Sequence, residues 1–153
     1  MDTRRSTRTR TAARTVAAVL AADAAIHLYW TTGLTWPAPD RATLSHLVLN
    51  ADVPFTPRVL LPLATVLLCA ATLLLTRTGH LPALARRLPA PLLHLAPYAV
   101  ATGLLLRALA GLVWITGLGS SPADPFYWLN LALYTPLCLL CAAATWTVAR
   151  SRT

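Results

Sequence analysis

Four long apolar stretches, separated by polar and proline-rich segments, dominate the pattern of the chain. Each is close to the roughly 20 residues that an α-helix needs to cross the hydrocarbon core of a bilayer. They run over residues 12–32, 58–76, 91–117 and 127–149. The pattern therefore predicts an all-α fold, a four-helix transmembrane bundle. Residues 12–149 form a single membrane domain, preceded by a basic tail at 1–11 and followed by a short basic tail at 150–153.

The segments between and within these stretches carry further signals. In the loop 33–57, Leu44, Leu47 and Val48 share one helical face, which predicts a short helix lying on the membrane surface. Pro97 and Pro136 fall inside spans, where a proline bends the helix and leaves a carbonyl one turn earlier without its usual partner. For Pro136 that carbonyl belongs to Ala132.

Composition supports a membrane protein. Of 153 residues, 56% are hydrophobic and only 12% are charged. The net charge of +8 raises the question of nucleic acid. However, the arginines concentrate at the flanks of the apolar stretches, where membrane topology alone would place them. We therefore expect the lipid bilayer, and no nucleic acid, as the partner of this surface.

The arginines also predict an orientation. Ten lie in the N-terminal tail, the 77–90 loop and the C-terminus, whereas the opposite side has only Arg41 and Arg58. By the positive-inside rule, both termini are expected in the cytoplasm of a multi-pass plasma membrane protein, in a bacterium the inner membrane. An alternative is a cleaved signal peptide, since Ala22-Asp23-Ala24 has the small-x-small form of a cleavage site. The apolar character continues past this point to Trp30, which favours a retained span.

Two charged side chains, Asp23 and Arg107, fall inside spans. Each such charge costs about 2.5 to 3.5 kcal/mol at the centre of a membrane helix, so it is normally paired inside the bundle. Counting 1.5 Å per residue from the outer helix ends places both about 14 Å below the outer boundary. We therefore predict that they meet within about 4 Å, directly or through one bridging group.

The helical period groups further polar side chains with this pair. Gly103, Arg107, Gly111 and Trp114 form one stripe of the third span, and the glycines predict that this stripe faces another helix. Other faces carry His27 and Trp30 beside Asp23, and Asn130 beside Tyr134. The predicted polar cluster therefore consists of Asp23, His27, Trp30, Arg107, Asn130 and Tyr134.

This cluster has a structural and a functional interpretation. It could be a buried ion pair that fixes helix register, or a site for a small molecule or a proton that opens outward. We expect neither cofactor nor metal. His94 lies at the cytoplasmic end of its span, so His27 and His94 are poorly placed to ligate one haem from two sides.

The three cysteines, Cys69, Cys138 and Cys141, all lie in apolar segments. Cys138-Leu-Leu-Cys141 has the Cys-x-x-Cys form found in quinone-linked thiol oxidoreductases of the membrane. Such relays need a second thiol pair, and the outer loops contain no cysteine. We therefore interpret these residues as packing residues.

The segments AAIHLYWTTG, LLRALAGL and FYWLNLALYTPLCLLCA resemble the bacterial membrane family called domain of unknown function 3995. The resemblance covers nearly the whole chain and involves His27, Tyr29, Trp30, Arg107, Tyr134, Pro136 and Cys138. It implies small four-span proteins with a polar cluster and implies no activity. The family pattern implies an aspartate where this chain has Asn130, which removes a possible charge partner for Arg107.

The sequence thus favours a non-enzymatic bundle. It would bind a lipid or a small apolar ligand, or serve as an accessory subunit of a membrane protein partner. The alternative is a small membrane enzyme acting through His27 and Arg107, and a thiol oxidoreductase using Cys138 and Cys141 is less favoured.

Overall fold

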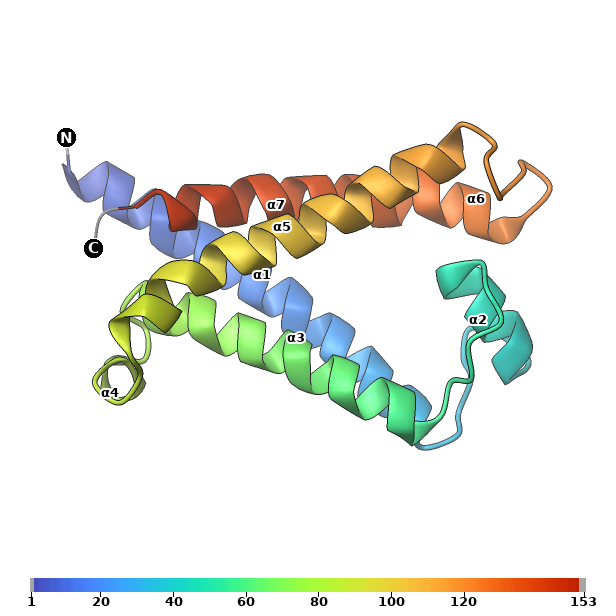
Figure 1. Cartoon of the computed structure of the whole chain (residues 1–153), viewed down its shortest axis with the longest axis horizontal. Helices are drawn as coiled ribbons and strands as arrows, with labels where there is room; N and C mark the ends of the chain where they lie inside the picture. Colours follow the sequence, from blue (N-terminus) through green and yellow to red (C-terminus); the bar gives the residue numbers. More distant parts are fainter. Residues whose placement is uncertain (1, 152–153) are drawn as a thin grey trace.

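The computed structural model describes residues 2–151, and every regular element in this range is helical. The elements are α1 (Asp2–Thr31), α2 (Arg41–Leu49), α3 (Pro57–Arg77), α4 (Pro82–Ala85), α5 (Ala90–Ile115), α6 (Pro125–Leu129), η1 (Asn130–Tyr134) and α7 (Thr135–Ala149). Four helical segments are long and apolar enough to cross a membrane: Ser6–Thr31, Pro57–Arg77, Ala90–Ile115 and Pro125–Ala149. The predicted all-α, four-span class is confirmed, and the two ends of the chain lie at the same end of the bundle (Figure 1).

The first helix begins earlier than the apolar pattern indicates. α1 starts at Asp2, so the basic segment 2–11 is helical and continuous with the first span. No glycine or proline interrupts the sequence from Asp2 to Thr31, and such residues are the main breakers of a helix. The helix stops before Gly33, whose φ of +94° lies in the left-handed region that glycine adopts without strain.

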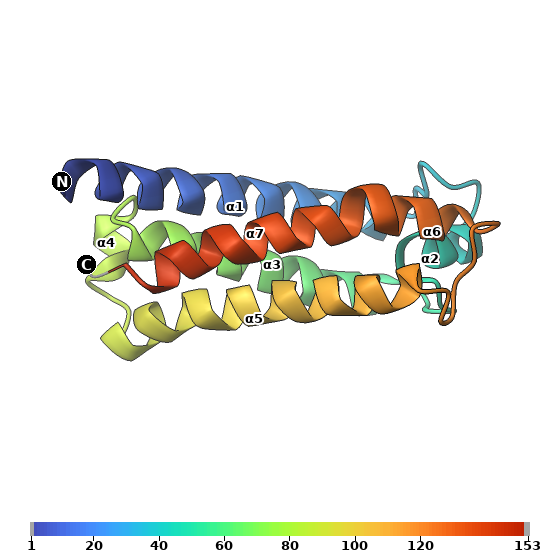
Figure 2. The ribbon, with the colours of Figure 1, turned by 90° about the horizontal axis from the view of Figure 1, so that it is seen from above.

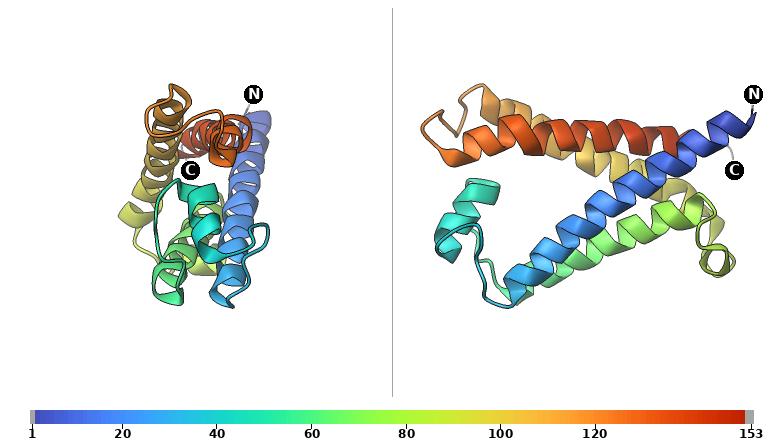
Figure 3. Two further views of the ribbon diagram at one scale, coloured as in Figure 1. Left: turned by 90° about the vertical axis from the view of Figure 1, so that its right-hand side faces the viewer. Right: turned by 180° about the vertical axis from the view of Figure 1, so that it is seen from behind.

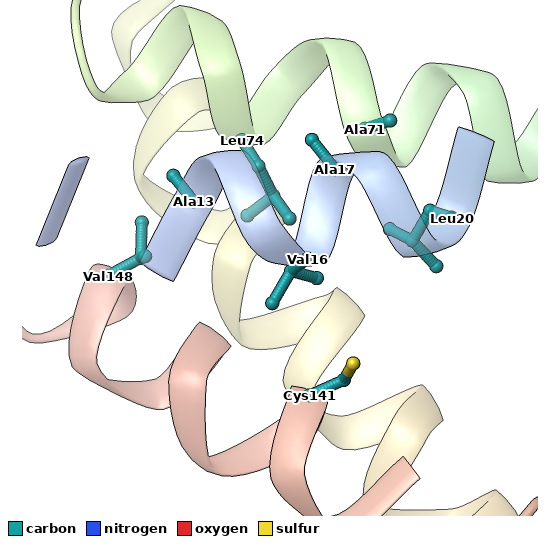
Figure 4. Close-up of a cluster of buried hydrophobic side chains, with 8 residues drawn as sticks. All are labelled: Ala13, Val16, Ala17, Leu20, Ala71, Leu74, Cys141 and Val148. Carbon is teal, nitrogen blue, oxygen red and sulfur yellow. The ribbon is translucent and has the colours of Figure 1, made fainter. Parts of the chain in front are cut away.

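The long helices form two antiparallel pairs, α1 with α3 and α5 with α7. Further contacts join α1 to α7 and α3 to α5, so that α1 and α5 lie on opposite sides of the bundle (Figure 2). The pairs meet in a core near the termini, where alanine and valine on α1 allow close approach (Figure 4). Its buried members are Ala13, Val16, Ala17, Leu20, Ala71, Leu74, Cys141 and Val148.

Away from the termini the two pairs diverge, as Figures 1 and 3 show. A second apolar cluster there joins only α1, α2, α3 and their loops, through Trp30, Ala38, Leu44, Phe55 and Leu60. The predicted helix in the 33–57 loop is confirmed as α2. It lies between the diverging ends, contacts α6, and its C-cap Asn50 donates a side-chain hydrogen bond to the carbonyl of Gly119. Away from the termini, this apolar cluster therefore belongs to the α1/α3 pair, and α2 bridges that pair to α6.

The fourth span is irregular at its proline. Residues Asn130–Tyr134 form a π-helical turn, in which the N–H of Thr135 donates to the carbonyl of Asn130, five residues earlier. Thr135, the residue whose N–H closes the turn, directly precedes Pro136, which has no N–H to continue the α-helical ladder. The predicted disturbance at Pro136 therefore takes the form of a widened turn. A further proline, Pro62, lies inside α3 and was not anticipated as an interior position.

Candidate functional site

The π-helical turn builds a buried polar centre on the α5/α7 pair. Asn130 is completely buried, and its Nδ2 donates to the carbonyl of Gly111 at 2.8 Å. Its Oδ1 accepts from the Thr135 hydroxyl at 3.1 Å and from Nη1 of Arg107 at 3.4 Å. Because the turn has five residues, Asn130 and Thr135 come onto the same side of the helix. One amide therefore connects α5 to both ends of the widened turn.

Gly111 makes this close approach possible. A Cβ atom at this position would lie 1.9 Å from Oγ1 of Thr135 and 2.9 Å from Oδ1 of Asn130. The prediction that Gly111 faces a neighbouring helix is correct. The same prediction for Gly103 is wrong, because Gly103 is exposed and a Cβ there would meet no atom within 4 Å. The helical period identifies residues on one stripe, but it does not say how far along that stripe the neighbouring helix stays in contact.

Arg107 lies between two aromatic rings. Its guanidinium carbon is 5.1 Å from the centroid of Trp114 and 5.6 Å from that of Tyr134. Such contacts stabilise a cation and orient the guanidinium plane. A guanidinium has five N–H donors, and within residues 2–151 its only hydrogen bond is the long one to Asn130. Most of the donors of Arg107 are therefore available to another molecule.

The second half of the polar cluster lies on α1. Nδ1 of His27 is 2.8 Å from the carbonyl oxygen of Asp23 and 3.3 Å from its Oδ1. Both oxygens are acceptors, so Nδ1 carries the hydrogen and donates. Nε2 of His27 makes no hydrogen bond to any residue that the structure describes, which leaves it open as an acceptor when the ring is neutral.

Trp30 holds the histidine ring in place. The His27 and Trp30 rings meet edge to face, with 5.2 Å between their centroids. The centroid of the Phe55 ring lies 5.5 Å from that of Trp30. Nε1 of Trp30 donates to the carbonyl of Trp36 at 3.0 Å, so the indole is fixed at both ends. His27 is buried, whereas half of the Asp23 side chain is exposed. This half of the cluster therefore has a rigid imidazole and an accessible carboxylate.

The predicted direct ion pair between Asp23 and Arg107 is wrong. Asp23 contacts His27 on its own helix, and Arg107 contacts Asn130 on its own pair; no shared bridging side chain joins them in the described chain. The reason is lateral separation: α1 and α5 belong to different pairs, and these pairs diverge away from the termini (Figure 3). Arg107 lies over the Tyr134 ring of η1, while α1, which carries Asp23, contacts α7.

The comparison with known families identifies the chain. The model of the family described as "Protein of unknown function (DUF3995)" matches residues 20–145, a range that contains the whole polar cluster. This chain belongs to the DUF3995 family. No curated protein and no solved structure matches it. Membership in the DUF3995 family therefore supports the four-span fold, and its description specifies no activity.

Three features of this DUF3995 protein lie outside the predicted cluster. Thr135, which the sequence analysis missed, donates a hydrogen bond from its hydroxyl to Asn130. Its position in the sequence, five residues after Asn130 and directly before a proline, could have indicated this contact. Nε2 of His46 in α2 lies 2.8 Å from Oδ1 of Asp52, which follows α2 in the chain. The cysteines are free thiols: Cys141 is part of the core near the termini, Cys138 is half-buried and Cys69 is exposed. Among the described residues no group of three metal-ligating side chains comes together.

Proposed function

We propose that this DUF3995 protein is a multi-pass protein of the plasma membrane, in bacteria the inner membrane. Both termini lie in the cytoplasm, and the outer half of the bundle binds a small amphipathic molecule without transforming it. The orientation rests on the arginine asymmetry, which favours the termini inside. The molecule would enter from the bilayer or from the outer surface, on the side where the helix pairs diverge.

The observation that carries the binding proposal is the unused hydrogen-bonding capacity of Arg107 and His27. A guanidinium at this depth is costly unless its donors are satisfied, and the chain supplies one long hydrogen bond. Nε2 of His27, on the other pair, also has no partner in the described chain. If the cluster served only to fix helix register, we would expect its two opposite charges to bind each other. A bound molecule supplies partners for both groups.

Native mass spectrometry of the protein in gentle detergent tests this proposal. We expect a small molecule of defined mass to co-purify with the wild type. Its occupancy should fall in Arg107→Gln and in His27→Asn. Arg150→Gln is the matched control. The guanidinium carbon of Arg150 also lies over an aromatic ring, 4.9 Å from the centroid of Trp146, but at the end of the bundle that holds the termini. Equal occupancy in all four proteins, or no bound molecule in any, would contradict the proposal. Recovery of a stoichiometric protein instead would indicate an accessory subunit.

One observation favours a second candidate, a small membrane enzyme. His27 has its Nδ1 held by the Asp23 carbonyl, so that Nε2 can act as a proton acceptor of fixed orientation, as in general base catalysis. Arg107 would then stabilise a developing negative charge. Incubating the protein with the molecule it binds distinguishes the two functions. A change in the mass of that molecule that is lost in His27→Asn would support the enzyme.

A further inference from the structure

Arg107 is a partly buried cation whose charge the described chain does not neutralise. No ion pair of residues 2–151 includes it. Its hydrogen bond to Oδ1 of Asn130 is long, at 3.4 Å, and its partner is an uncharged amide. An arginine within a membrane span normally pairs with an acid or with backbone carbonyls. The α5/α7 pair therefore presents a positive charge that suits an anion from outside the chain.

The two rings that contact Arg107 carry further donors. The centroids of Trp114 and Tyr134 lie 5.1 and 5.6 Å from the guanidinium carbon. The indole N–H of Trp114 and the hydroxyl of Tyr134 have no hydrogen-bond partner among the described residues. Nε of Arg77 is the one side-chain polar atom of that part of the chain that is both fully buried and unpartnered, so these two donors are accessible. Three side chains in mutual contact thus offer N–H and O–H groups to one ligand.

The contacts of Arg107 also show at which height its charge lies. The side chain reaches Trp114, seven residues later in α5. Its hydrogen-bond partner Asn130 donates to the carbonyl of Gly111, one turn after Arg107. Gly111 is four residues, or about 6 Å, from Ile115 at the end of the helix. The guanidinium therefore lies near the end of the span, where the polar group of a membrane amphiphile can reach it.

Open space lies beside α5 on the other side of Arg107, toward the middle of the span. Gly103 is one turn before Arg107 on the same stripe, and it is exposed. A Cβ atom at Gly103 would meet no atom within 4 Å. Its neighbours on this side of the helix, Val100 and Leu104, are apolar. A hydrocarbon chain that passes over Gly103 would therefore contact apolar surface and meet no side chain in its way.

We infer that the molecule bound by this protein is an anionic amphiphile, with its carboxylate or phosphate on Arg107 and its hydrocarbon tail along α5 over Gly103. This inference rests on the proposed function and specifies the charge of its ligand. A guanidinium binds two oxygens of either group through parallel hydrogen bonds, and Trp114 and Tyr134 each offer one more donor. The phosphate of an anionic phospholipid and the carboxylate of a free fatty acid share this chemistry.

Titration of the full chain in dodecyl maltoside tests the inference. Native mass spectrometry measures the binding of palmitate, hexadecyl phosphate and hexadecanol, which have similar tails, at equal mole fractions in the micelle. We expect both anions to bind at least about tenfold more tightly than the alcohol, because only they form charge-assisted hydrogen bonds with Arg107. The tighter of the two identifies the natural ligand as a fatty acid or as a lipid phosphate. Acetate and inorganic phosphate, which have no tail, should displace neither anion.

Three variants and one control assign the binding to these residues. Arg107→Gln should bring the affinities of the anions and the alcohol close together, and Arg107→Lys, which keeps the charge without the fork, should give an intermediate preference. Gly103→Leu should weaken all three probes by a similar factor, because it fills the space of the tail. Arg58→Gln, at the exposed start of α3, changes the net charge as Arg107→Gln does and should retain the full preference. Thermal unfolding verifies that each variant is folded.

Several outcomes would overturn the inference and leave the proposed function standing. Equal affinity of the wild type for the alcohol and the anions would show that the ligand is not an anion. A loss of preference in Arg58→Gln as large as in Arg107→Gln would assign the preference to net charge alone. Unchanged binding in Gly103→Leu, or displacement by acetate or inorganic phosphate, would contradict the position of the tail. If no probe binds and nothing co-purifies with the wild type, the proposed function fails as well.

Discussion

At the scale of single residues, the hydrogen bonds of Asn130 explain why this chain has an amide where the family pattern implies an aspartate. Its Nδ2 donates to the carbonyl of Gly111, while its Oδ1 accepts from Thr135 and Arg107. An ionised carboxylate could accept from the last two, but it would place a second acceptor against the Gly111 carbonyl. The amide thus satisfies a buried backbone group that an ionised carboxylate could not, and Arg107 is left without a countercharge.

Gly111→Ala should destabilise the protein. The added Cβ would lie 1.9 Å from Oγ1 of Thr135, so helix α5 or η1 has to move. We expect the free energy of unfolding to fall by about 1–3 kcal/mol, the usual cost of overpacking a well-packed site. Gly103→Ala is the matched control on the same helix, because nothing lies within 4 Å of its Cβ position. There, alanine should be neutral or stabilise by up to about 1 kcal/mol through its higher helix propensity. Thermal unfolding in detergent measures both, and equal stability of the two variants would contradict the packing at Gly111.

Replacing Cys138 and Cys141 together by alanine should leave the protein folded and its binding of a small molecule intact. Cys141 belongs to the core near the termini, so we expect the free energy of unfolding to fall by about 1 kcal/mol through lost packing. Melting temperature and the occupancy measured by native mass spectrometry report the two properties. Cys69→Ala, at an exposed position, should have no effect on either. Isolation of a disulfide between Cys138 and Cys141 that exchanges with quinone would instead support the oxidoreductase.

At the scale of elements, the short helix α2 depends on its N-cap. Oδ1 of Asp40 accepts from the N–H of Thr43 at 2.8 Å, and Oδ2 accepts from its hydroxyl at 2.9 Å. These hydrogen bonds, the backbone one first, lower the pKa of Asp40 below its ordinary value of 3.8. Because the folded pKa is the lower one, the stabilisation is complete above the ordinary pKa. It is lost as the pH falls through the folded value.

Asp40→Ala should therefore loosen α2 at neutral pH. Hydrogen exchange of the amides in residues 41–49 should become faster, because the first turn loses its cap. In the wild type the same amides should lose protection as the pH falls through the folded pKa of Asp40, which the hydrogen bonds from Thr43 hold below its ordinary value. Asp40→Asn keeps a capping oxygen without a charge, so its protection should be close to that of the wild type at neutral pH and show less dependence on pH. Unchanged exchange in Asp40→Ala would mean that packing of α2 on its neighbours holds the helix without the cap.

At the scale of the whole molecule, positive charge gathers at the end of the bundle that holds both termini. Burial lowers the pKa of His80, and the neighbouring charges of Arg10 and Arg14 lower it further. Arg77 at the end of α3 donates to the carbonyl of Ser151 at 3.0 Å and so ties the C-terminus to the same end. The acids Asp40, Asp52 and Asp124 lie in the loops at the opposite end.

The charge distribution predicts the topology. Reporters fused after Thr153 or within residues 78–85 should be cytoplasmic, and one within 38–50 should be outside. In a background without the native cysteines, Asp52→Cys should react with an impermeant reagent added to intact cells, since that side chain is 88% exposed. Arg86→Cys, in the 77–90 loop, should react only after permeabilisation. The reverse pattern would invert the orientation and place the polar cluster in the inner half of the membrane.

Sequence alone determined the features that depend on short stretches of chain. Four spans follow from local hydropathy, because a helix in lipid has to satisfy its own backbone. The helix α2 follows from the spacing of Leu44, Leu47 and Val48, and the disturbance of the fourth span follows from Pro136. The sequence also predicted polar helix faces that include His27, Trp30 and Asn130. The helical period alone assigns a side chain to a face, without knowledge of the neighbouring helix.

Only the tertiary structure decided how these faces meet. Residue counting gave Asp23 and Arg107 the same depth, but depth is a coordinate along the helix axes and says nothing of lateral distance. The pairs α1/α3 and α5/α7 share a core near the termini and diverge beyond it, so the two charges stay apart. No atom lies within 4 Å of a Cβ placed at Gly103, and the π-helical turn brings Thr135 to Asn130. Crossing angles and helix distortions arise from packing between segments far apart in the sequence, which no local pattern encodes.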